Sequence, residues 1–549
     1  MSAPPVTLAE RALRHQLAGE LVHAQAIWRH LVVAEPDNAL ARFYLGTLLG
    51  SLGQYAEAET WLAEAVRLAP DLPELLGNLG VVRQRLGRLE DAVVCYRKAL
   101  TLRHDLLEVH NNLGGALQEL GRAEESLAAY RNAGVTDSAT AANILTTLNL
   151  VPGTRAQFLA EAQDWARRFA DPLTPPRANR PRGTRLRIGY VGADGFCRHT
   201  LALTWLPLLE AHDTRRVEVF AYSDLPTARE DDISQRFQAV STWRHTADLD
   251  DERLAALIRE DRIDVLVDGI GFAAGTRLLA FARRPAPVQV HFPPMSTTGM
   301  KAMDYVVGDA RLFPESAEAD FSETIYRLPC AFLYAPLTDL PPLTPPPATK
   351  NGYVTFGSFS RPPKISTTAL AAWARILSAL PGSHLRIKSG ALLTDGTVAT
   401  LRRGLARHGV APDRLEFRTR VADDIAHYQE LLDIDIALDT FPHGGVLTTC
   451  DALTMGVPVV TLTGERVLER YGATLVQEAG FAEGSVTDVD RYVGHAVSLG
   501  SDVPRLAALR PQLAASMRGS ALCDAPRFTT TLEDAYDAMY RQTAGAPSA

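Results

Sequence analysis

The sequence predicts a protein of two parts, an α-helical repeat array followed by a larger α/β region made of two doubly wound, Rossmann-like halves. Three observations predict this. Glycines recur every 34 residues near the N-terminus, short apolar runs alternate with longer amphipathic stretches from about residue 185, and a proline-rich segment divides those runs into two sets. At 549 residues the chain is too long for one hydrophobic core, so two to four domains are expected.

The composition is that of a folded protein, with 46% hydrophobic and 22% charged residues. A net charge of -8, without a basic patch, argues against nucleic-acid binding. The five cysteines form no CxxC pair, so neither a zinc knuckle nor a disulfide framework is predicted. No export signal precedes the repeats and no window approaches 18 uninterrupted apolar residues, so we expect a cytoplasmic protein without membrane insertion.

The N-terminal repeat has four visible copies. In the copy 38–70, one helical pattern ends at a Leu-Gly-Gln-Tyr turn, and a second runs from 56 to 68 until a proline stops it. A plain helical bundle has no reason to keep this register, and the pattern resembles the tetratricopeptide repeat. Such a solenoid has a concave groove that binds peptides, so a protein partner is expected. The recurring residues are Gly46, Gly80 and Gly114; Gly19, Gly53, Gly87 and Gly121; Ala24, Ala58 and Ala92; Ala65, Ala99 and Ala133; and Pro36 and Pro70.

Nine apolar runs are the candidate strands of the α/β region. The segment 336–350 between the two sets is proline-rich and is expected to form neither helix nor central strand. Neither half carries a GxGxxG or Walker motif, which disfavours a dehydrogenase or a P-loop kinase. Two Rossmann-like halves joined by a linker are the arrangement of a GT-B glycosyltransferase. The runs are 186–191, 217–222, 263–267 and 288–290 in the first set, and 354–356, 385–387, 415–417, 434–438 and 459–462 in the second.

The block 439–451 is the most informative stretch of the α/β region. The glycine pair 444–445 predicts a turn that leads into a helix opened by Thr448 and Thr449, with Asp451 in its first turn. Amides exposed at a helix N-terminus, with adjacent hydroxyls, make an anion site suited to a diphosphate. An acidic residue there can accept hydrogen bonds from ribose hydroxyls. The alternative is an ordinary N-cap, in which the threonines satisfy the helix's own amides.

Two further residues are candidates for catalysis. Lys364 precedes an amphipathic helix that starts near Thr367, so its ammonium would project from a loop at the top of the second sheet and neutralise a departing diphosphate. His199 follows the first strand of the first half and should face the cleft, where a neutral imidazole can orient an acceptor hydroxyl or accept its proton. The simpler alternatives are a solvated loop lysine and a histidine that caps a helix.

Taken together, the motifs resemble the family of O-linked N-acetylglucosamine transferases and Spindly proteins, particularly its bacterial members. The resemblance runs from the repeats to about residue 540. It rests on the ordered blocks 187–191 with Asp194 and His199, 263–268, 284–289, 298–299, 303–305, 356–364, 439–451 and 455–460.

The resemblance implies roles for individual residues. Thr448 and Thr449 would bind the pyrophosphate and Asp451 the ribose, while Lys364 would stabilise the leaving group. His427 matches a family histidine near the nucleotide base, and Arg470 matches an arginine in the helix after Gly464. A structural histidine and a salt-bridging arginine are the simpler alternatives for the last two. In this family the identity of the base is unsettled, so a donor phosphate oxygen is an alternative to His199.

Several positions depart from the family. Bacterial members typically have other residues at 271–273 and in the loop 291–299, Val446 and Leu447 replace residues that are more often Gly or His and Thr, and Gly195 is an extra residue. The scaffold persists while the sugar-side and acceptor-side loops diverge, so a donor other than UDP-N-acetylglucosamine is an alternative. A DxD spacing at 433–435 lies in an apolar run that predicts a strand, and we expect neither a metal nor another cofactor.

The expected function is inverting, metal-independent transfer of a sugar from a UDP-N-acetylglucosamine-like donor to Ser or Thr of a protein held in the repeat groove. One alternative is a flagellin glycosyltransferase with a CMP-nonulosonic acid donor, and another is a non-catalytic scaffold. Homo-oligomer formation stays open. The expected segments are the repeat array (1–134), a helical linker (135–183), an acceptor-side lobe (184–335), a proline-rich linker (336–351), a nucleotide-sugar lobe (352–512) and a C-terminal helical segment (513–549).

Overall fold

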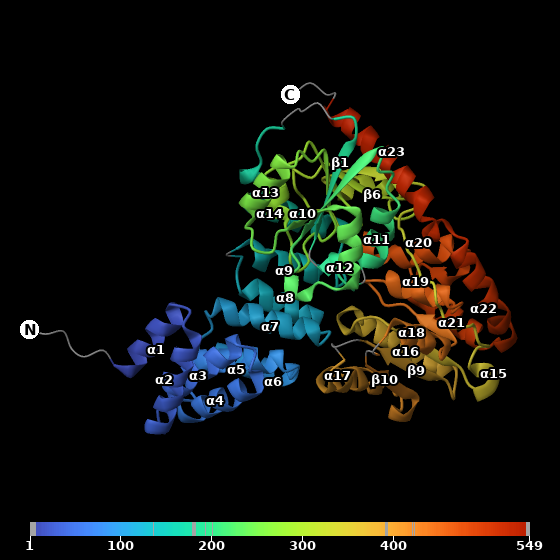
Figure 1. The fold of residues 1–549 in the computed structure, drawn as a ribbon. Coiled ribbons are helices and arrows are strands. Elements are labelled where there is room, and N and C mark those ends of the chain that lie inside the picture. The colour runs from blue at the N-terminus through green and yellow to red at the C-terminus, as the bar shows by residue number, and fades with distance from the viewer. Residues whose placement is uncertain are drawn as a thin grey trace, which may run out of the picture. The chain divides into compact units, whose positions relative to one another are not determined.

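The structure is a computed structural model that describes residues 7–135, 137–177, 183–192, 194–199, 201–389, 393–419, 421 and 423–544. Its contacts divide the chain into two compact units (Figure 1). One unit comprises residues 1–136 with 391–401, and the other comprises 137–390 with 402–549. Among the described residues, no helix is both long enough and apolar enough to cross a bilayer.

The repeat array consists of antiparallel helix pairs, as the 34-residue period predicts. Glycine in the first helix of a pair admits a large side chain from the second, because a Cβ on Gly46 would lie 2.7 Å from Leu62 and one on Gly80 would lie 2.5 Å from Tyr96. The turn glycines have φ of +75° or +76°, which glycine adopts without strain. Within 7–135 the helices are α1 (Leu8–Leu17), α2 (Leu21–Ala34), α3 (Ala39–Ser51), α4 (Tyr55–Leu68), α5 (Pro73–Arg85), α6 (Leu89–Leu102), α7 (Leu107–Glu119) and α8 (Ala123–Asn132).

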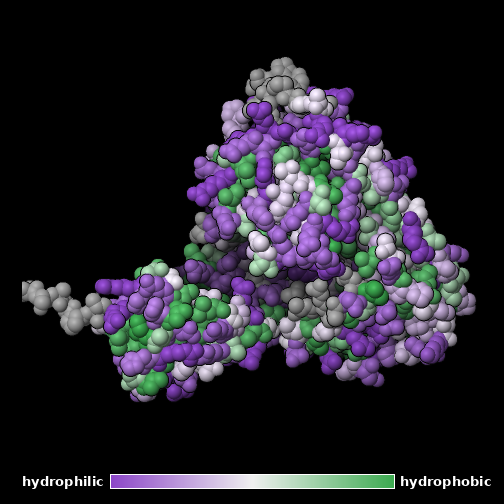
Figure 2. Space-filling view, in the orientation of Figure 1, coloured by the Kyte–Doolittle hydropathy of each residue, from purple (hydrophilic) through white to green (hydrophobic). Residues whose placement is uncertain are grey.

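The surface of the array mixes polar and apolar side chains (Figure 2). Apolar side chains appear among the charged ones on the face that Figure 2 shows. The exposed apolar residues of the array include Leu17, Val22 and Val33. The interior is continuous between successive hairpins, because Trp28 and Leu62 belong to one buried cluster. Each pair of helices therefore buries its apolar face against its neighbour, as in other solenoids.

Helical segments follow the repeats and begin the second unit. Asp137 and Thr154 cap the two α-helices through their side chains. The segments are α9 (Ser138–Leu148), α10 (Arg155–Trp165), the π-helix η1 (Ala166–Ala170) and the 3-10 helix η2 (Asp171–Leu173).

The first sheet has seven strands among the described residues, in the order β3-β2-β1-β4-β5-β6-β7, and all its described pairs are parallel. The four runs predicted from the sequence are β1, β2, β4 and β5, and β3, β6 and β7 were not predicted. The strands are β1 (Leu186–Gly192), β2 (Val217–Ser223), β3 (Thr242–His245), β4 (Val265–Asp268), β5 (Val288–His291), β6 (Tyr305–Gly308) and β7 (Thr324–Arg327). The helices of this lobe are η3 (Asp194–Phe196), α11 (Ala202–Glu210), η4 (Thr227–Arg229), α12 (Asp232–Val240), α13 (Asp251–Glu260), α14 (Leu278–Ala282) and η5 (Glu315–Asp320).

The second sheet has six strands among the described residues, in the order β10-β9-β8-β11-β12-β13, again with parallel pairs. All five predicted runs are strands, and only the two-residue β13 was missed. The strands are β8 (Thr355–Ser358), β9 (His384–Lys388), β10 (Leu415–Arg418), β11 (Ile436–Leu438), β12 (Val459–Leu462) and β13 (Ser485–Val486). The two-sheet GT-B arrangement predicted from the sequence is confirmed.

Most of the helices that follow residue 345 belong to the second unit, and residues 395–401 of α17 belong to the first. The prediction that 336–350 contains no helix is wrong at its end, because Ala348 begins one helical turn once the last proline is passed. The helices are α15 (Ala348–Asn351), η6 (Pro362–Lys364), α16 (Thr367–Ala379), α17 (Asp395–Ala406), η7 (Pro412–Arg414), α18 (Asp424–Leu432), α19 (Leu447–Thr454), η8 (Val467–Glu469), α20 (Tyr471–Glu478), η9 (Ala482–Gly484), α21 (Val489–Gly500), α22 (Val503–Arg518) and η10 (Ala521–Cys523).

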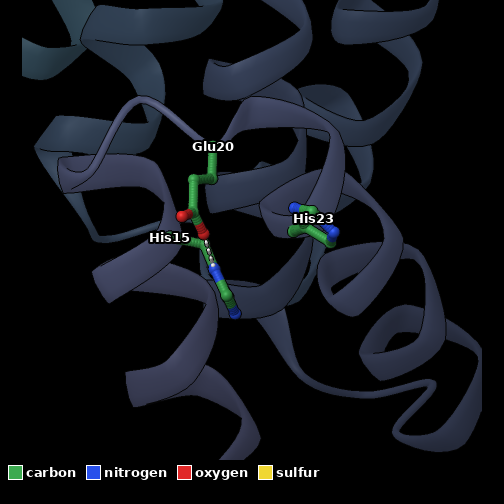
Figure 3. Close-up of side chains that lie close together, drawn as sticks. All are labelled: His15, Glu20 and His23. Carbon is green, nitrogen blue, oxygen red and sulfur yellow. Dashed lines mark hydrogen bonds and ion pairs between the residues drawn. The ribbon is translucent and has the colours of Figure 1, made fainter.

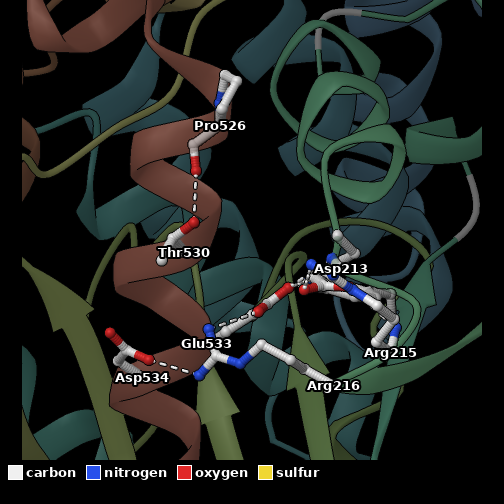
Figure 4. Close-up of polar contacts among 9 residues, drawn as sticks. Asp213, Arg215, Arg216, Pro526, Thr530, Glu533 and Asp534 are labelled. Carbon is white, nitrogen blue, oxygen red and sulfur yellow. Dashed lines mark hydrogen bonds and ion pairs between the residues drawn. The ribbon is translucent and has the colours of Figure 1, made fainter.

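The C-terminal helix α23 (Ala525–Ala544) returns to the first lobe (Figure 4). Its Glu533 is 2% exposed and accepts hydrogen bonds from the backbone N–H of Asp213 and from His212, each at 2.9 Å. Arg216 lies 3.0 Å from the same carboxylate and also pairs with Asp534. A buried carboxylate is costly without such partners, so this contact fixes the end of the chain against the first sheet.

Candidate functional site

The second sheet reverses its strand order between β8 and β11. In open parallel sheets, ligands bind outside the carboxyl ends of the strands at such a switch point. A cleft with about 300 Å³ of empty space lies there, and its lining includes Ser360, Asp439, Thr448 and Thr449. The block 439–451 therefore lies at the position where this fold binds ligands.

The N-terminus of α19 forms one wall of the cleft. Its N-cap residue is Val446, and no side chain makes a capping hydrogen bond. The N-cap alternative for Thr448 and Thr449 is therefore wrong, because the helix begins at Leu447, before either threonine. The positive end of the helix dipole and two hydroxyls remain at the cleft, which is the arrangement that favours an anion.

Asp439 holds the loop that leads into α19. Its carboxylate accepts hydrogen bonds from the backbone N–H of Thr440 at 2.8 Å and Gly445 at 2.6 Å, and from the hydroxyl of Thr461 at 2.7 Å. Burial raises the pKa of this carboxyl group, and these donors oppose the shift. A Cβ on Gly445 would lie 2.6 Å from the Thr449 hydroxyl oxygen and 3.0 Å from Asp439, so only glycine fits.

Lys364 lies at the end of the 3-10 helix η6, on the other side of this loop. Its Nζ donates a hydrogen bond to the carbonyl oxygen of Gly444 at 3.1 Å. Burial lowers the pKa of Lys364 to about 8, although the Asp439 carboxylate acts in the opposite direction. Lys364 thus contacts the loop that leads into α19, the helix that carries Thr448 and Thr449.

His443 is a residue of this loop that the sequence interpretation missed. Its Nδ1 is buried and has no hydrogen-bond partner among the described residues. Burial holds the pKa of His443 well below its usual value, and Lys364, Arg466 and Arg361 add to the shift. The imidazole is therefore neutral, and the three cations that lower its pKa make its surroundings electropositive.

His427 lies in α18 and contacts both the sheet and α19. Lys388 Nζ is 3.1 Å from His427 Nδ1, and His427 Nε2 is 3.3 Å from Asp451 Oδ2. A lysine ammonium can only donate, so Nδ1 accepts and the proton lies on Nε2, from which it is donated to Asp451. Lys388 is 5% exposed and also pairs with Glu430 at 2.5 Å.

Asp451 is the most heavily hydrogen-bonded of the predicted residues. Besides His427, it accepts hydrogen bonds from the hydroxyls of Tyr334 at 2.7 Å and Tyr428 at 3.0 Å, both at Oδ1. Its expected place in the first turn of the helix is wrong, because α19 begins at Leu447 and Asp451 is its fifth residue. The two tyrosines could not be found from the sequence, since Tyr334 lies 117 positions away.

Arg470 lies apart from this cluster. Its Nε donates to the carbonyl oxygen of Arg311 at 2.7 Å, and its Nη1 donates to that of Gly464 at 3.2 Å. Burial lowers the pKa of Arg470, and the charge of Arg155 acts in the same direction. The guanidinium joins the 464–470 loop to the first lobe, and Arg470 is not among the residues that line the cleft described above.

The first sheet has its own switch point, between β1 and β4. His199 follows β1 and η3 and is exposed. Its Nδ1 lies 3.4 Å from the backbone N–H of Leu201, the N-cap residue of α11. The histidine therefore lies near the predicted edge of the sheet, and it also makes the helix-end contact of the simpler alternative.

A buried Asp–His pair occupies the same edge and was missed by the sequence interpretation. His291 Nδ1 lies 2.8 Å from Asp268 Oδ2, and both residues are 1% exposed. Burial alone would lower the pKa of His291, but the Asp268 carboxylate outweighs it and the net shift is upward. Asp268 also accepts a hydrogen bond from the backbone N–H of Gly271 at 3.0 Å.

Asp435, the second aspartate of the DxD spacing at 433–435, accepts hydrogen bonds from backbone amides. Asp435 is 1% exposed and accepts hydrogen bonds from the backbone N–H of Ala348 at 2.9 Å and Thr355 at 2.8 Å. The strand begins at Ile436, later than predicted, although the backbone N–H of Asp435 already donates to the carbonyl oxygen of Thr355 at 2.8 Å. Across the described ranges, the one group of three side chains with metal-ligand spacing is His15, Glu20 and His23 in the repeat array.

Comparison with known proteins identifies relatives over both parts of the chain. The model of glycosyl transferase family 41 matches residues 169–338 and 349–532, and tetratricopeptide repeat models match 44–69 and 85–121. A Solanum lycopersicum protein named probable UDP-N-acetylglucosamine--peptide N-acetylglucosaminyltransferase SPINDLY is 36% identical over 74% of this chain, and its Arabidopsis thaliana counterpart is 34% identical over 74%. The chain spans about half the length of the curated relatives it matches, 45% in both cases.

A solved structure is similar over nearly the whole chain. It is a lysine-to-methionine mutant of the Thermobaculum terrenum O-GlcNAc transferase, 35% identical, with 98% of this chain and 97% of that chain covered and a TM-score of 0.74. The two-sheet fold, the repeats and these matches agree, and the chain belongs to glycosyltransferase family 41.

Proposed function

We propose that this chain is a protein O-glycosyltransferase that moves a sugar from a nucleoside diphosphate donor to a Ser or Thr hydroxyl. One observation carries the proposal. The half-buried Lys364 and the uncapped N-terminus of α19 lie on either side of the 439–446 loop, at the switch point of the second sheet. Lys364 and the helix N-terminus are two positive groups beside this loop, and they suit a diphosphate that gains charge as it leaves.

The proposed reaction is a single inverting displacement. The acceptor hydroxyl oxygen forms a bond to the anomeric carbon while the bond from that carbon to the phosphate oxygen breaks. The electron pair stays with the diphosphate, which Lys364, Thr448 and Thr449 stabilise. The hydroxyl proton passes to His199 or to a donor phosphate oxygen.

The proposed donor is UDP-N-acetylglucosamine, and the proposed acceptor is a polypeptide held by the repeats. The names of the plant relatives and of the solved transferase support this donor. In this proposal His427 contacts the nucleoside, which its position beside Asp451 supports. Asp451 would bind the ribose through the lone pairs that are not used by its three protein donors. The orphan Nδ1 of His443 supports an additional contact to the diphosphate or the sugar.

Metal-independent transfer is part of the proposal. A lysine and helix amides supply the positive charge that a cation supplies elsewhere, and the Asp435 carboxylate already serves two backbone amides. We expect transfer to continue in EDTA. Loss of transfer in EDTA, with recovery on addition of Mg²⁺ or Mn²⁺, would contradict this part.

The test is a donor screen on the purified chain with co-purified proteins, read by intact mass. We expect a mass gain of one N-acetylhexosamine per modified site with the UDP donor. Lys364→Ala should abolish transfer, whereas the matched control Lys350→Ala, on an exposed helical turn of the same lobe, should not. Transfer only from a CMP-linked donor would show that the UDP donor proposed above is wrong. If the chain bound no nucleotide, the result would favour a non-catalytic scaffold.

A further inference from the structure

The first hairpin of the repeat array brings together three side chains that ligate metals, His15, Glu20 and His23 (Figure 3). Their ligand atoms all lie within 4.8 Å of one another. Glu20 Oε2 contacts His15 Nδ1, and the two imidazole rings have centroids 5.4 Å apart. The donor cleft uses none of these residues, so the cluster is independent of the proposed transfer reaction.

The turn between the two helices creates this arrangement. His15 lies in the last turn of α1, and Gly19 takes φ of +76° to reverse the chain. Glu20 is the N-cap residue of α2 but makes no side-chain capping hydrogen bond, and His23 follows within the first turn. The carboxylate is thus turned away from the helix amides and toward His15.

The other copies of the repeat do not carry this combination. At the register of His15 the buried Leu49 and Leu117 are core residues. At the register of Glu20 the third and fourth copies have arginines that pair with nearby glutamates. The equivalent residues are Leu49, Arg83 and Leu117 for His15; Gln54, Arg88 and Arg122 for Glu20; and Glu57, Asp91 and Glu125 for His23.

We propose that His15, Glu20 and His23 bind a zinc ion, with water as the fourth ligand. Two imidazoles and one carboxylate are a donor set that Zn²⁺ accepts, whereas Mg²⁺ prefers oxygen ligands. Tetrahedral zinc needs ligand atoms about 3.4 Å apart. His15 and Glu20 have side chains 31% and 52% exposed, so rotamer changes can bring the ligand atoms to this spacing without moving the backbone.

The bound ion would join the end of α1 to the start of α2 across the turn. Zinc should therefore slow amide exchange in 8–34 and leave the donor cleft unchanged. The competing interpretation is an imidazolium–carboxylate ion pair without a metal. An ion pair needs a protonated histidine, whereas zinc needs neutral imidazoles, so the two respond oppositely to acidification.

The test is calorimetric titration of the untagged full chain with Zn²⁺ alone and with Mg²⁺ alone, at about pH 7.5 and about pH 5.5. We expect one zinc ion per chain at the higher pH, loss of binding at the lower pH, and no binding of Mg²⁺. His15→Ala and His23→Ala should each weaken zinc binding at least about tenfold. The matched control His30→Ala, an exposed histidine of the same helix α2, should leave it unchanged.

Two results would overturn the proposal. Zinc binding that is equal in the wild-type chain and in both variants would place the ion elsewhere. No binding at about pH 7.5 would leave only the ion pair. Glu20→Gln controls for misfolding of the alanine variants, because it keeps the shape of the side chain while removing the anionic ligand.

Discussion

The two sheets of the second unit have the same parallel topology but differ in what their switch points carry. After β8 and β11, hydrogen bonds join Lys364 to Gly444 and Asp439 to Gly445, and a separate chain joins His427 to Asp451. After β1 lies the exposed His199, and the buried Asp268–His291 pair lies at the same edge of the sheet. Preorganised polar groups stabilise developing charge best, so the second switch point suits the proposed diphosphate site, and the exposed histidine at the first suits the proposed contact with an acceptor hydroxyl.

Apart from the loss of transfer expected in Lys364→Ala, the largest expected effect is at His199. His199→Ala should lower the transfer rate about a hundredfold or more, because it removes the proposed base, and should leave UDP affinity unchanged. The measurement is kcat for transfer together with a UDP titration. The matched control is His245→Ala, an exposed histidine of β3. Full activity in His199→Ala would assign the proton to a donor phosphate oxygen.

A smaller effect is expected from crowding the 439–446 loop. In Gly445→Ala the new Cβ would lie 2.9 Å from the Thr448 hydroxyl oxygen and 3.0 Å from Asp439 Oδ1, so the loop must shift. UDP affinity should fall by about tenfold or more, measured by calorimetry. Gly494→Ala is the control, because a Cβ there meets nothing within 4 Å. Equal affinities in both variants would show that the loop does not hold the diphosphate.

A still smaller effect is expected at Asp451. Tyr334→Phe removes one of the two hydroxyls that donate to Asp451 Oδ1 and should raise the KM for the donor by about threefold to tenfold. The value of kcat should change less, because the hydroxyl touches no reacting atom. Tyr353→Phe, with an exposed ring, serves as the control. A fall in kcat without a change in KM would place Tyr334 closer to the chemistry.

The smallest effect is a pH dependence. Burial lowers the pKa of Lys364 to about 8, so the ammonium predominates below this pH and is lost above it. The kcat/KM for the donor should therefore be halved near pH 8 and fall further at higher pH. Lys364→Arg should remove this alkaline limb, because a guanidinium stays protonated. A limb that persists in Lys364→Arg would belong to another group.

The sequence predicted the elements that have a strong local signal. The 34-residue glycine register predicted the repeats, because the helix glycines make room for a large side chain of the next helix and the turn glycines take a positive φ. The strand–turn–helix at 436–454 followed from an apolar run and a glycine turn. The sequence interpretation missed β3 and β7, because edge strands lack a continuous apolar run. The exposed or half-buried residues of these two strands include Arg244 and Arg327.

Only those residues of the candidate site that lie close together in the sequence could be predicted as neighbours. Thr448 and Thr449 stand in one motif and share one cleft, as expected. Tyr334 and Lys388 come from distant segments, and no local pattern indicates that they meet Asp451 and His427. His443 stands within the motif, but its buried, orphaned nitrogen arises from packing that spacing does not encode.

The most direct test of the central claim is titration of UDP into the wild-type chain, Lys364→Ala and the control Lys350→Ala. The claim is that the switch point of the second sheet is a nucleoside diphosphate site built around Lys364 and α19. We expect binding to the wild type and to Lys350→Ala, with at least about tenfold weaker binding to Lys364→Ala. Equal affinity for all three proteins, or no UDP binding by the wild type, would contradict the claim.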